Sequence, residues 1–255
     1  MTDVNVSLFR WPFRRVPGDD TAALIAALHK RNVTQAWAGS LEGVFHKDLA
    51  SANTRLAEEC RRFGAGMLQP FGSVNPKLPD WQEDLRRCHE EHKMPGIRLH
   101  PNYHGYDLKD AAFSELLHSA TARRLVVQLA VCLEDERTQH PLMRVPPVDI
   151  SPLANLLKNE PEARLVVLNS DPLHNLEQAQ ELFSLGNVSF DIAMVEGAGG
   201  VARLAQKVSV SRVLFGTHYP LFYFESAVLK IREAGFTDAD RQAILDGNAR
   251  KMLAA

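Results

Sequence analysis

Short runs of apolar and β-branched residues alternate along the chain with longer segments in which apolar residues recur every three or four positions. The first pattern predicts buried strands and the second predicts amphipathic helices. The predicted strands are 3–9, 34–38, 67–74, 96–100, 125–132, 164–169, 188–192 and 212–215. The predicted helices between and after them are 21–31, 49–63, 81–91, 110–122, 153–158, 173–184, 196–208 and 225–234.

This alternation predicts parallel strands that are joined by crossover helices. Eight such units in 255 residues match the size of a (β/α)8 barrel, and residues 237–255 then form closing helices. A doubly wound open sheet is the alternative, but no G-x-G-x-x-G follows the first strand. We therefore predict an α/β protein with a single TIM-barrel domain over residues 1–255.

The charge balance excludes some classes of partner. Lys and Arg number 29 against 31 Asp and Glu, and the basic residues are scattered, so a nucleic-acid partner is not expected. No run approaches the ~18 apolar residues of a membrane helix, and the first residues lack the apolar region of a secretory signal. We expect a cytoplasmic protein that acts on a small molecule and does not bind a membrane. Whether it forms a homo-oligomer is left open.

Polar side chains interrupt several predicted strands or stand at their C-terminal ends. An unpaired buried polar group costs about 1–3 kcal/mol, so such residues need partners or a function. In a barrel enzyme, the C-terminal ends of the strands carry the active site. We therefore predict a site that is built from Asn5, Ser7, Ser73, Asn75, Arg98, His100, Gln128, Asn169, Asp191 and His218.

Four segments, taken in order, resemble motifs of the amidohydrolase-related family of metal-dependent TIM-barrel hydrolases. This family includes decarboxylases of aminocarboxymuconate type and several lactonases. The segments are D-V-N-V-S at 3–7, G-I-R-L-H-P at 96–101, G-T-H-Y-P at 216–220 and G-N-A-R-K-M-L at 247–253. The resemblance implies a barrel that hydrolyses a small molecule.

The usual metal ligands of this family are replaced. Its members open with D-x-H-x-H, carry a histidine on the fifth strand and often on the sixth, and end the eighth with G-S-D-x-P. The matching positions here are Asn5, Ser7, Gln128, Asn169 and His218. Amides and hydroxyls bind zinc poorly. We expect no cofactor and no metal at the usual place.

The resemblance and the residue chemistry together suggest roles for the polar set. His218 is the predicted general base, because a histidine accepts a proton near neutral pH. Arg98 is predicted to bind a substrate carboxylate through its fork of donors, and His100 to polarise the substrate. Asp191 is predicted to orient a proton carrier. The remaining predicted substrate contacts are Asn5, Ser7, Gln128, Asn169, Tyr103 and His104.

Some segments allow two interpretations. Residues 102–106 form either a lid or a packed aromatic loop, and residues 10–14 either wall the pocket or contact another subunit. Residues 134–140, dense in charge, are predicted to be a solvated face. Residues 197–200 could bind an anion at a helix start, and Glu196 could cap that helix.

Three functions follow from these observations. The first is a hydrolase that acts, without the usual metal, on a small carboxylate-bearing ester, lactone or amide. The second is a catalytically inactive barrel that binds a small molecule or serves as a scaffold. The third is a decarboxylase-like enzyme or hydrolase with a relocated zinc site formed by His100, His104, His218 and a carboxylate.

Overall fold

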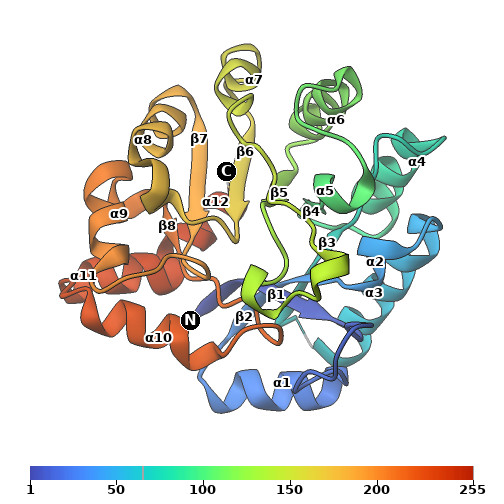
Figure 1. The fold of residues 1–255 in the computed structure, drawn as a ribbon. Helices are drawn as coiled ribbons and strands as arrows, with labels where there is room; N and C mark the ends of the chain where they lie inside the picture. The colour runs from blue at the N-terminus through green and yellow to red at the C-terminus, as the bar shows by residue number, and fades with distance from the viewer. Residues whose placement is uncertain (65, 255) are drawn as a thin grey trace.

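Eight parallel strands form a barrel that is enclosed by helices (Figure 1). The computed structural model describes residues 1–64 and 66–254. The strands pair in sequence order. Their bounds are β1 Thr2–Leu8, β2 Gln35–Ser40, β3 Leu68–Gly72, β4 Gly96–Leu99, β5 Val126–Ala130, β6 Arg164–Leu168, β7 Asn187–Asp191 and β8 Val213–Leu214. The predicted (β/α)8 fold is confirmed.

The seam between the first and last strands closes the barrel. Strand β8 has only two residues, so regular pairing there is short. Two backbone bonds extend the seam: Val4 N donates to Phe215 O at 2.9 Å, and Ser7 N donates to Tyr219 O at 3.0 Å. The chain beyond β8 therefore continues alongside β1 and positions the residues around 218.

Helices follow the strands nearly as the sequence predicts. They are α1 Thr21–Lys30, α2 Glu42–Phe45, α3 Leu49–Gly64, α4 Trp81–Arg86, α5 Pro101–His104, α6 Ala111–Ala122, α7 Leu153–Asn159, α8 Leu176–Leu185, α9 Gly200–Val208, α10 Phe224–Glu233, α11 Asp238–Gln242 and α12 Asn248–Ala254. Shorter helical turns are η1 Arg87–Glu91, η2 Glu136–Thr138, η3 Pro141–Met143, η4 Pro172–Asn175, η5 Val210–Arg212 and η6 Ala243–Gly247. None of these described helices is long and apolar enough to cross a membrane.

Helix α9 begins four residues later than predicted. Gly197 and Gly199 have φ values of 79° and 66°, in the left-handed region that a helix does not continue through. Glu196 therefore does not cap α9, and it accepts a bond from Arg137 instead. The carboxylate of Glu233 on α10 accepts from Gly199 N, so the chain itself supplies an anion at this helix start. The short helices α2 and α5 were not predicted.

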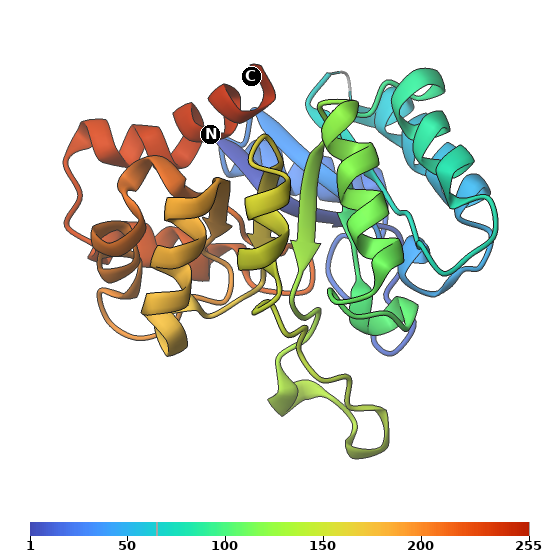
Figure 2. The ribbon, with the colours of Figure 1, turned by 90° about the horizontal axis from the view of Figure 1, so that it is seen from above.

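The N-terminal end of the barrel is closed by the tail of the chain. Figure 2 shows α12 at this end, while the segment between β5 and α7 projects from the opposite end. Ala249 and Met252 of α12 pack on an interior layer that includes the stacked rings of Trp37 and Phe71. The predicted closing helices are thus present through residue 254, and residue 255 lies outside the described residues.

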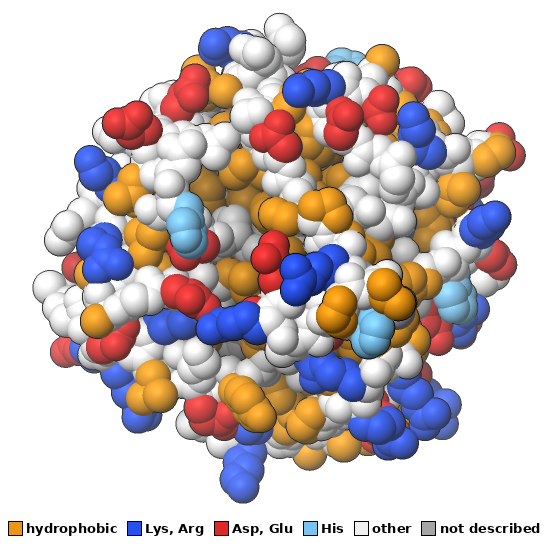
Figure 3. Space-filling model, in the orientation of Figure 1, with side chains coloured by type: hydrophobic (Ala, Val, Ile, Leu, Met, Phe, Trp, Pro, Cys, Tyr) orange, Lys and Arg blue, Asp and Glu red, His pale blue; other side chains and the backbone are white. Residues whose placement is uncertain are grey.

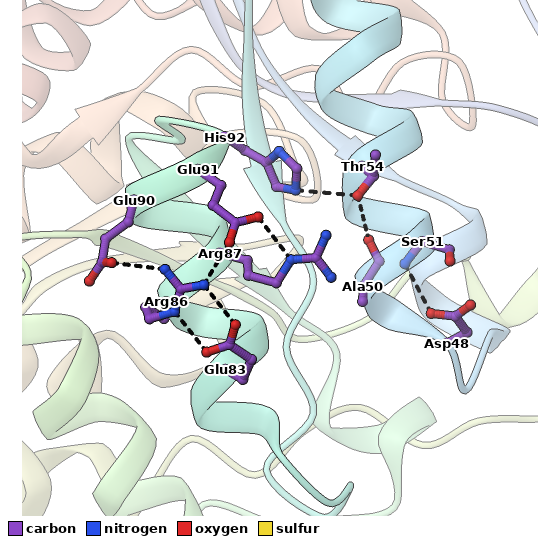
Figure 4. A network of polar contacts seen from close by, with 10 residues as sticks. All are labelled: Asp48, Ala50, Ser51, Thr54, Glu83, Arg86, Arg87, Glu90, Glu91 and His92. Carbon is purple, nitrogen blue, oxygen red and sulfur yellow. Dashed lines mark hydrogen bonds and ion pairs between the residues drawn. The ribbon is translucent and has the colours of Figure 1, made fainter.

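A network of ion pairs lies on the outer surface of α4 and η1 (Figure 4). Arg86 pairs with Glu83, Glu90 and Glu91. Such exposed pairs contribute little to stability, because water and salt screen them. A bond of 3.3 Å between Thr54 Oγ1 and a ring nitrogen of His92 links this region to α3. The network therefore belongs to the outer surface.

Arg98 crosses the barrel from β4 to β1 and β2. Its guanidinium has five acceptors, which are Gln128 Oε1, Ser7 Oγ and the carbonyl oxygens of Val4, Val6 and Trp37. The β1–β2 register shifts between Asp3 and Val6, and such a bulge disrupts the regular ladder. Two of the five acceptors, the carbonyls of Val4 and Val6, lie at this irregularity.

We predict that Gly39→Ala destabilises the fold. A Cβ at Gly39 would lie 2.7 Å from Arg98 Nη1 and 2.8 Å from its Cδ. Because this guanidinium is held on all sides, the clash cannot be relieved by rotation, and overpacking of this kind costs about 1–3 kcal/mol. Urea unfolding would measure the loss. As a control, Gly186→Ala meets its nearest atom at 3.4 Å and should change stability less; equal losses would contradict the prediction.

Candidate functional site

The C-terminal ends of β1, β6, β7 and β8, here called the mouth, bring four predicted residues together. Asn5 Nδ2 donates to Asn169 Oδ1 at 2.7 Å and to Asp191 Oδ2 at 2.8 Å. The backbone N of Asn169 donates to Asp191 Oδ1 at 2.9 Å. His218 completes the group, and all four residues are buried. They come from strands that are far apart in sequence and meet only in the closed barrel.

His218 is held in one orientation. Its Nε2 lies 2.7 Å from Leu133 O, an acceptor, so Nε2 carries the hydrogen and Nδ1 carries the lone pair. Nδ1 lies 3.4 Å from Asn5 Oδ1 and 3.4 Å from Asn169 Nδ2. Burial lowers the pKa of His218 to about 4, so the ring is neutral near pH 7.

The backbone at two of these residues is strained. His218 has φ 57° and Asn169 has φ 53°, both in the left-handed region that non-glycine residues rarely adopt. Strained backbone of this kind persists only where the surroundings hold it, and it gathers at functional sites. At His218 the holding contacts are the Leu133 carbonyl and the Phe222 N–H, which donates to the carbonyl of His218 at 3.1 Å.

Two buried carboxyl groups contact Asn5: Asp191, which belongs to this group, and Asp3, which does not. Asp3 accepts from Asn5 N, from Thr217 N and from Thr217 Oγ1, the last at 2.6 Å. Burial raises the pKa of Asp3 to about 7 and that of Asp191 to about 6, although their hydrogen bonds act in the opposite direction. In the sequence Asp3 stands out only as part of a motif, and no spacing indicates its bond to Thr217 across the seam.

The predicted contacts Arg98, Gln128 and Ser7 lie deeper in the barrel. The five acceptors described above occupy the donors of Arg98, and Gln128 Nε2 donates to Val4 O at 2.7 Å. A substrate carboxylate could reach Arg98 only by displacing one of these five acceptors, three of which are backbone carbonyls. The geometry therefore favours a structural role for this arginine over the predicted carboxylate contact.

His100, His104 and Tyr103 lie on the β4 side of the mouth. His100 is buried and its Nδ1 has no partner among the described residues, and burial holds its pKa well below the usual range. His104 Nε2 lies 3.0 Å from Gly43 O, to which it donates, and its ring centre is 6.0 Å from that of His100. Tyr103 packs edge-on against Phe45, with ring centres 5.6 Å apart. This contact agrees with the packed aromatic loop, one of the two interpretations of residues 102–106.

Apolar residues from four loops cover the mouth. We call them the apolar cap: Trp11, Val16, Leu41, Val44, Leu133 and Leu221. Trp11 Nε1 and Arg14 Nε both donate to Glu134 Oε1, at 3.0 and 3.2 Å, and Arg14 also donates to Leu221 O. Glu134 is thus buried, whereas residues 135–140 are exposed or half-buried, as predicted for this segment. Residues 10–14 contribute to the wall above the site.

A cleft of about 1100 Å³ lies beside the cap. We call it the β7–β8 cleft, because most of its lining comes from residues 193–198 after β7, residues 219–223 after β8 and one face of α10. The rest of the lining is Arg14, Arg15, Pro17, Asp135, Arg137 and Thr138. Figure 3 looks onto this end of the barrel and shows acidic and basic side chains next to one another near its centre, with apolar side chains around them. Phe222 lines the cleft, and its ring centre is 5.0 Å from that of His218. This phenyl ring therefore stands between the cleft and the buried histidine.

The residues at the usual metal positions do not fit a divalent cation. Asn5, Gln128 and Asn169 are amides whose groups bond to one another, to Arg98 or to backbone carbonyls. Amide and hydroxyl groups are weak ligands beside imidazole or carboxylate. Within residues 1–64 and 66–254, no three His, Cys, Asp or Glu side chains come together as a metal group, and this includes His100, His104 and His218.

Comparisons with known proteins agree with the barrel. Residues 10–254 match the family model described as amidohydrolase. No curated protein sequence matches the chain. Similar solved structures include 2,6-dihydroxybenzoate decarboxylase from Rhizobium, with TM-score 0.75, 13% identity and 99% of each chain covered. A 5-carboxyvanillate decarboxylase from Sphingomonas paucimobilis has TM-score 0.77 and 12% identity, covering 99% of this chain and 98% of that one.

A third similar structure contains a metal. It is a dihydroxybenzoic acid decarboxylase from Polaromonas with bound manganese and the inhibitor 2-nitroresorcinol. Its TM-score is 0.70 at 12% identity, with 99% of this chain and 97% of that chain covered. At these identities the structural similarity concerns the fold.

We predict that Asp191 makes stability depend on pH. Its pKa is raised on folding, so its contribution to the free energy of unfolding is full below about pH 4 and is lost as the pH rises through about 6. The free energy of unfolding of the wild type, relative to Asp191→Asn, should fall by roughly 2 kcal/mol between pH 4 and 8. Urea unfolding across this range would measure it.

The matched control is Asp238→Asn, whose side chain is 97% exposed in the wild type. Its pH profile should run parallel to that of the wild type. If the profile of Asp191→Asn also runs parallel, the buried carboxyl does not titrate as described.

Proposed function

The chain belongs to the amidohydrolase family, and on this premise we propose that it is a hydrolase of small carboxylate-bearing esters, lactones or amides. The proposed reaction needs no metal at the usual position, where the amide and hydroxyl donors do not fit one. The relatives named above are decarboxylases of aromatic carboxylates, which supports a carboxylate in the substrate but not the type of reaction.

The observation that carries this proposal is the geometry of His218. Its Nε2–H is fixed on Leu133 O, and its Nδ1 lone pair points into a polar group at the mouth. A general base must be unprotonated at the working pH and oriented toward the proton that it takes. The lowered pKa of His218 satisfies the first condition near pH 7, and the Leu133 carbonyl provides the second.

In the proposed mechanism, a water held at Nδ1 of His218 attacks the substrate carbonyl carbon. The water proton passes to Nδ1 as the new C–O bond forms and the carbonyl becomes an oxyanion. The imidazolium faces two acceptors, Leu133 O and Asn5 Oδ1, which offset part of the cost of burying its charge. His218 then returns the proton to the leaving oxygen or nitrogen as the original acyl bond breaks.

Access to His218 requires a movement. The ring of Phe222 lies against the imidazole, and the apolar cap covers the mouth. We place the substrate's approach through the β7–β8 cleft, because Phe222 lines the cleft and touches His218. The Phe222 side chain is only partly buried, and its rotation would open a path from the β7–β8 cleft to His218. Asn5 and Asn169 then lie within reach of a substrate oxygen.

The second candidate is an inactive barrel that binds a small molecule. It is favoured by the completeness of the hydrogen bonding, since Asn5, Asp191 and Arg98 already have partners without any ligand. The cleft would remain as the binding site. Hydrolysis by the wild type distinguishes the two candidates.

We predict that His218→Asn lowers kcat/KM by at least ~100-fold toward an activated ester with a carboxylate, such as mono-4-nitrophenyl glutarate, because general-base catalysis contributes about that much. Release of nitrophenolate measures the rate. His174→Asn, which alters a side chain that is 86% exposed, is the matched control and should hydrolyse at the wild-type rate.

Metal content belongs in the same experiment. Untagged protein that was purified without chelator should hydrolyse the ester without bound metal, as measured by mass spectrometry of the elements. An unchanged rate in His218→Asn would exclude the base assignment. Loss of activity on removing a stoichiometric metal would exclude the metal-free reaction, and no hydrolysis by the wild type would favour the binding barrel.

A further inference from the structure

Lys230 is a basic side chain in the β7–β8 cleft with no acidic partner. It lies on α10, lines the cleft and is only partly exposed. Among the described residues, no carboxylate lies within 4 Å of its ammonium. Its Nζ donates to Ile192 O at 3.2 Å and to Ala193 O at 2.7 Å. An ammonium has three N–H donors, so one remains.

The other basic side chains of the cleft are already paired. Arg14 bonds to Glu134, and Arg15 lies 2.9 Å from Asp19. Arg137 bonds to Asp135 and Glu196. The carboxylate of Glu233, which also lines the cleft, accepts from the backbone N–H of Gly199. An anion that enters the cleft thus meets one cation whose charge is not compensated by direct contact.

The rest of the lining is largely apolar. Tyr219, Leu221 and Phe222 lie on one wall, with Met194 and Val195 on another, and Leu229 on α10. Apolar walls with a few placed polar groups are typical of small-molecule sites, and a volume of about 300–1,000 Å³ is usual for them. The cleft volume of about 1100 Å³ is slightly above this range.

We propose that the β7–β8 cleft binds a small monocarboxylate with an apolar or aromatic body, and that Lys230 is the residue that binds its carboxylate. This inference rests on the proposed function, because it names where the substrate's carboxylate is held. Lys230, which lines the cleft, thereby takes the carboxylate-binding role that the sequence predicted for Arg98. The donors of Arg98 are already occupied inside the barrel.

The position of Lys230 suits that role. The carbonyls that hold its ammonium belong to the residues directly after Asp191, at the C-terminal end of β7. These two carbonyls hold the Lys230 ammonium close to the mouth. Phe222 lies on the inner wall of the cleft, against His218. A ligand whose carboxylate is bound by Lys230 would direct its other end toward His218 once Phe222 rotates.

The test uses benzoate and benzamide as probes, which share shape and size but differ in charge. Isothermal titration calorimetry on the full chain should give a Kd for benzoate at least ~10-fold lower than for benzamide, as expected for a hydrogen bond to a charged group. Lys230→Met should remove this preference, and Lys230→Arg should retain most of it. Lys207→Met, on the exposed face of α9, is the matched control and should bind benzoate as the wild type does.

Equal affinity for the two probes, no binding of benzoate, or an undiminished preference in Lys230→Met would overturn the proposal. Thermal unfolding of both Lys230 variants shows whether they fold, and retention of the preference by Lys230→Arg distinguishes lost charge from lost structure. Benzoate cannot be hydrolysed, so its binding is independent of the reaction. If the protein hydrolyses the ester but does not prefer benzoate over benzamide, only the assignment of the carboxylate site to the cleft is rejected. If it prefers benzoate but does not hydrolyse the ester, only the proposed hydrolase activity is rejected.

Discussion

A charged guanidinium in the middle of the barrel sets the arrangement of the residues around it. A buried cation is tolerated only where its donors are paired, and Arg98 takes acceptors from β1, β2 and β5. Burial lowers its pKa only to about 10, so it remains charged near neutral pH. Asp3 and Asp191 lie near enough to act on this charge. The irregular β1 register and the small residue at position 39 both accommodate this one side chain.

Above the guanidinium, amides occupy the positions where the family usually binds metal. An amide offers both a donor and an acceptor, so Asn5 and Asn169 can connect Asp191 to His218 without any ion. The Leu133 carbonyl then fixes the imidazole tautomer from the other side of the ring. Because the donors of Asn5 and the acceptors of Asp191 are paired with each other or with Asn169, the mouth is stable in its closed form.

The sequence predicts the barrel and the polar residues at the strand ends, because hydrophobic periodicity and strand order are local signals. It does not predict which polar groups meet. The acceptors of Arg98 come from three other strands, and Lys230 lies on a helix where its pattern is that of any surface lysine. The apolar cap assembles loops after β1, β2, β5 and β8. Such contacts depend on register and loop path, which single segments do not encode.

The two-residue last strand has a consequence for how the chain becomes a barrel. Its seam is secured by the bond between Thr217 and Asp3, which are 214 positions apart. Contacts of such long separation are slow to form. During synthesis β1 is made before β8, so one edge of β1 lacks its partner until then. An unpaired sheet edge is prone to pairing with other chains. The edge of β1 therefore has no partner within the barrel until the segment after β8 has been made.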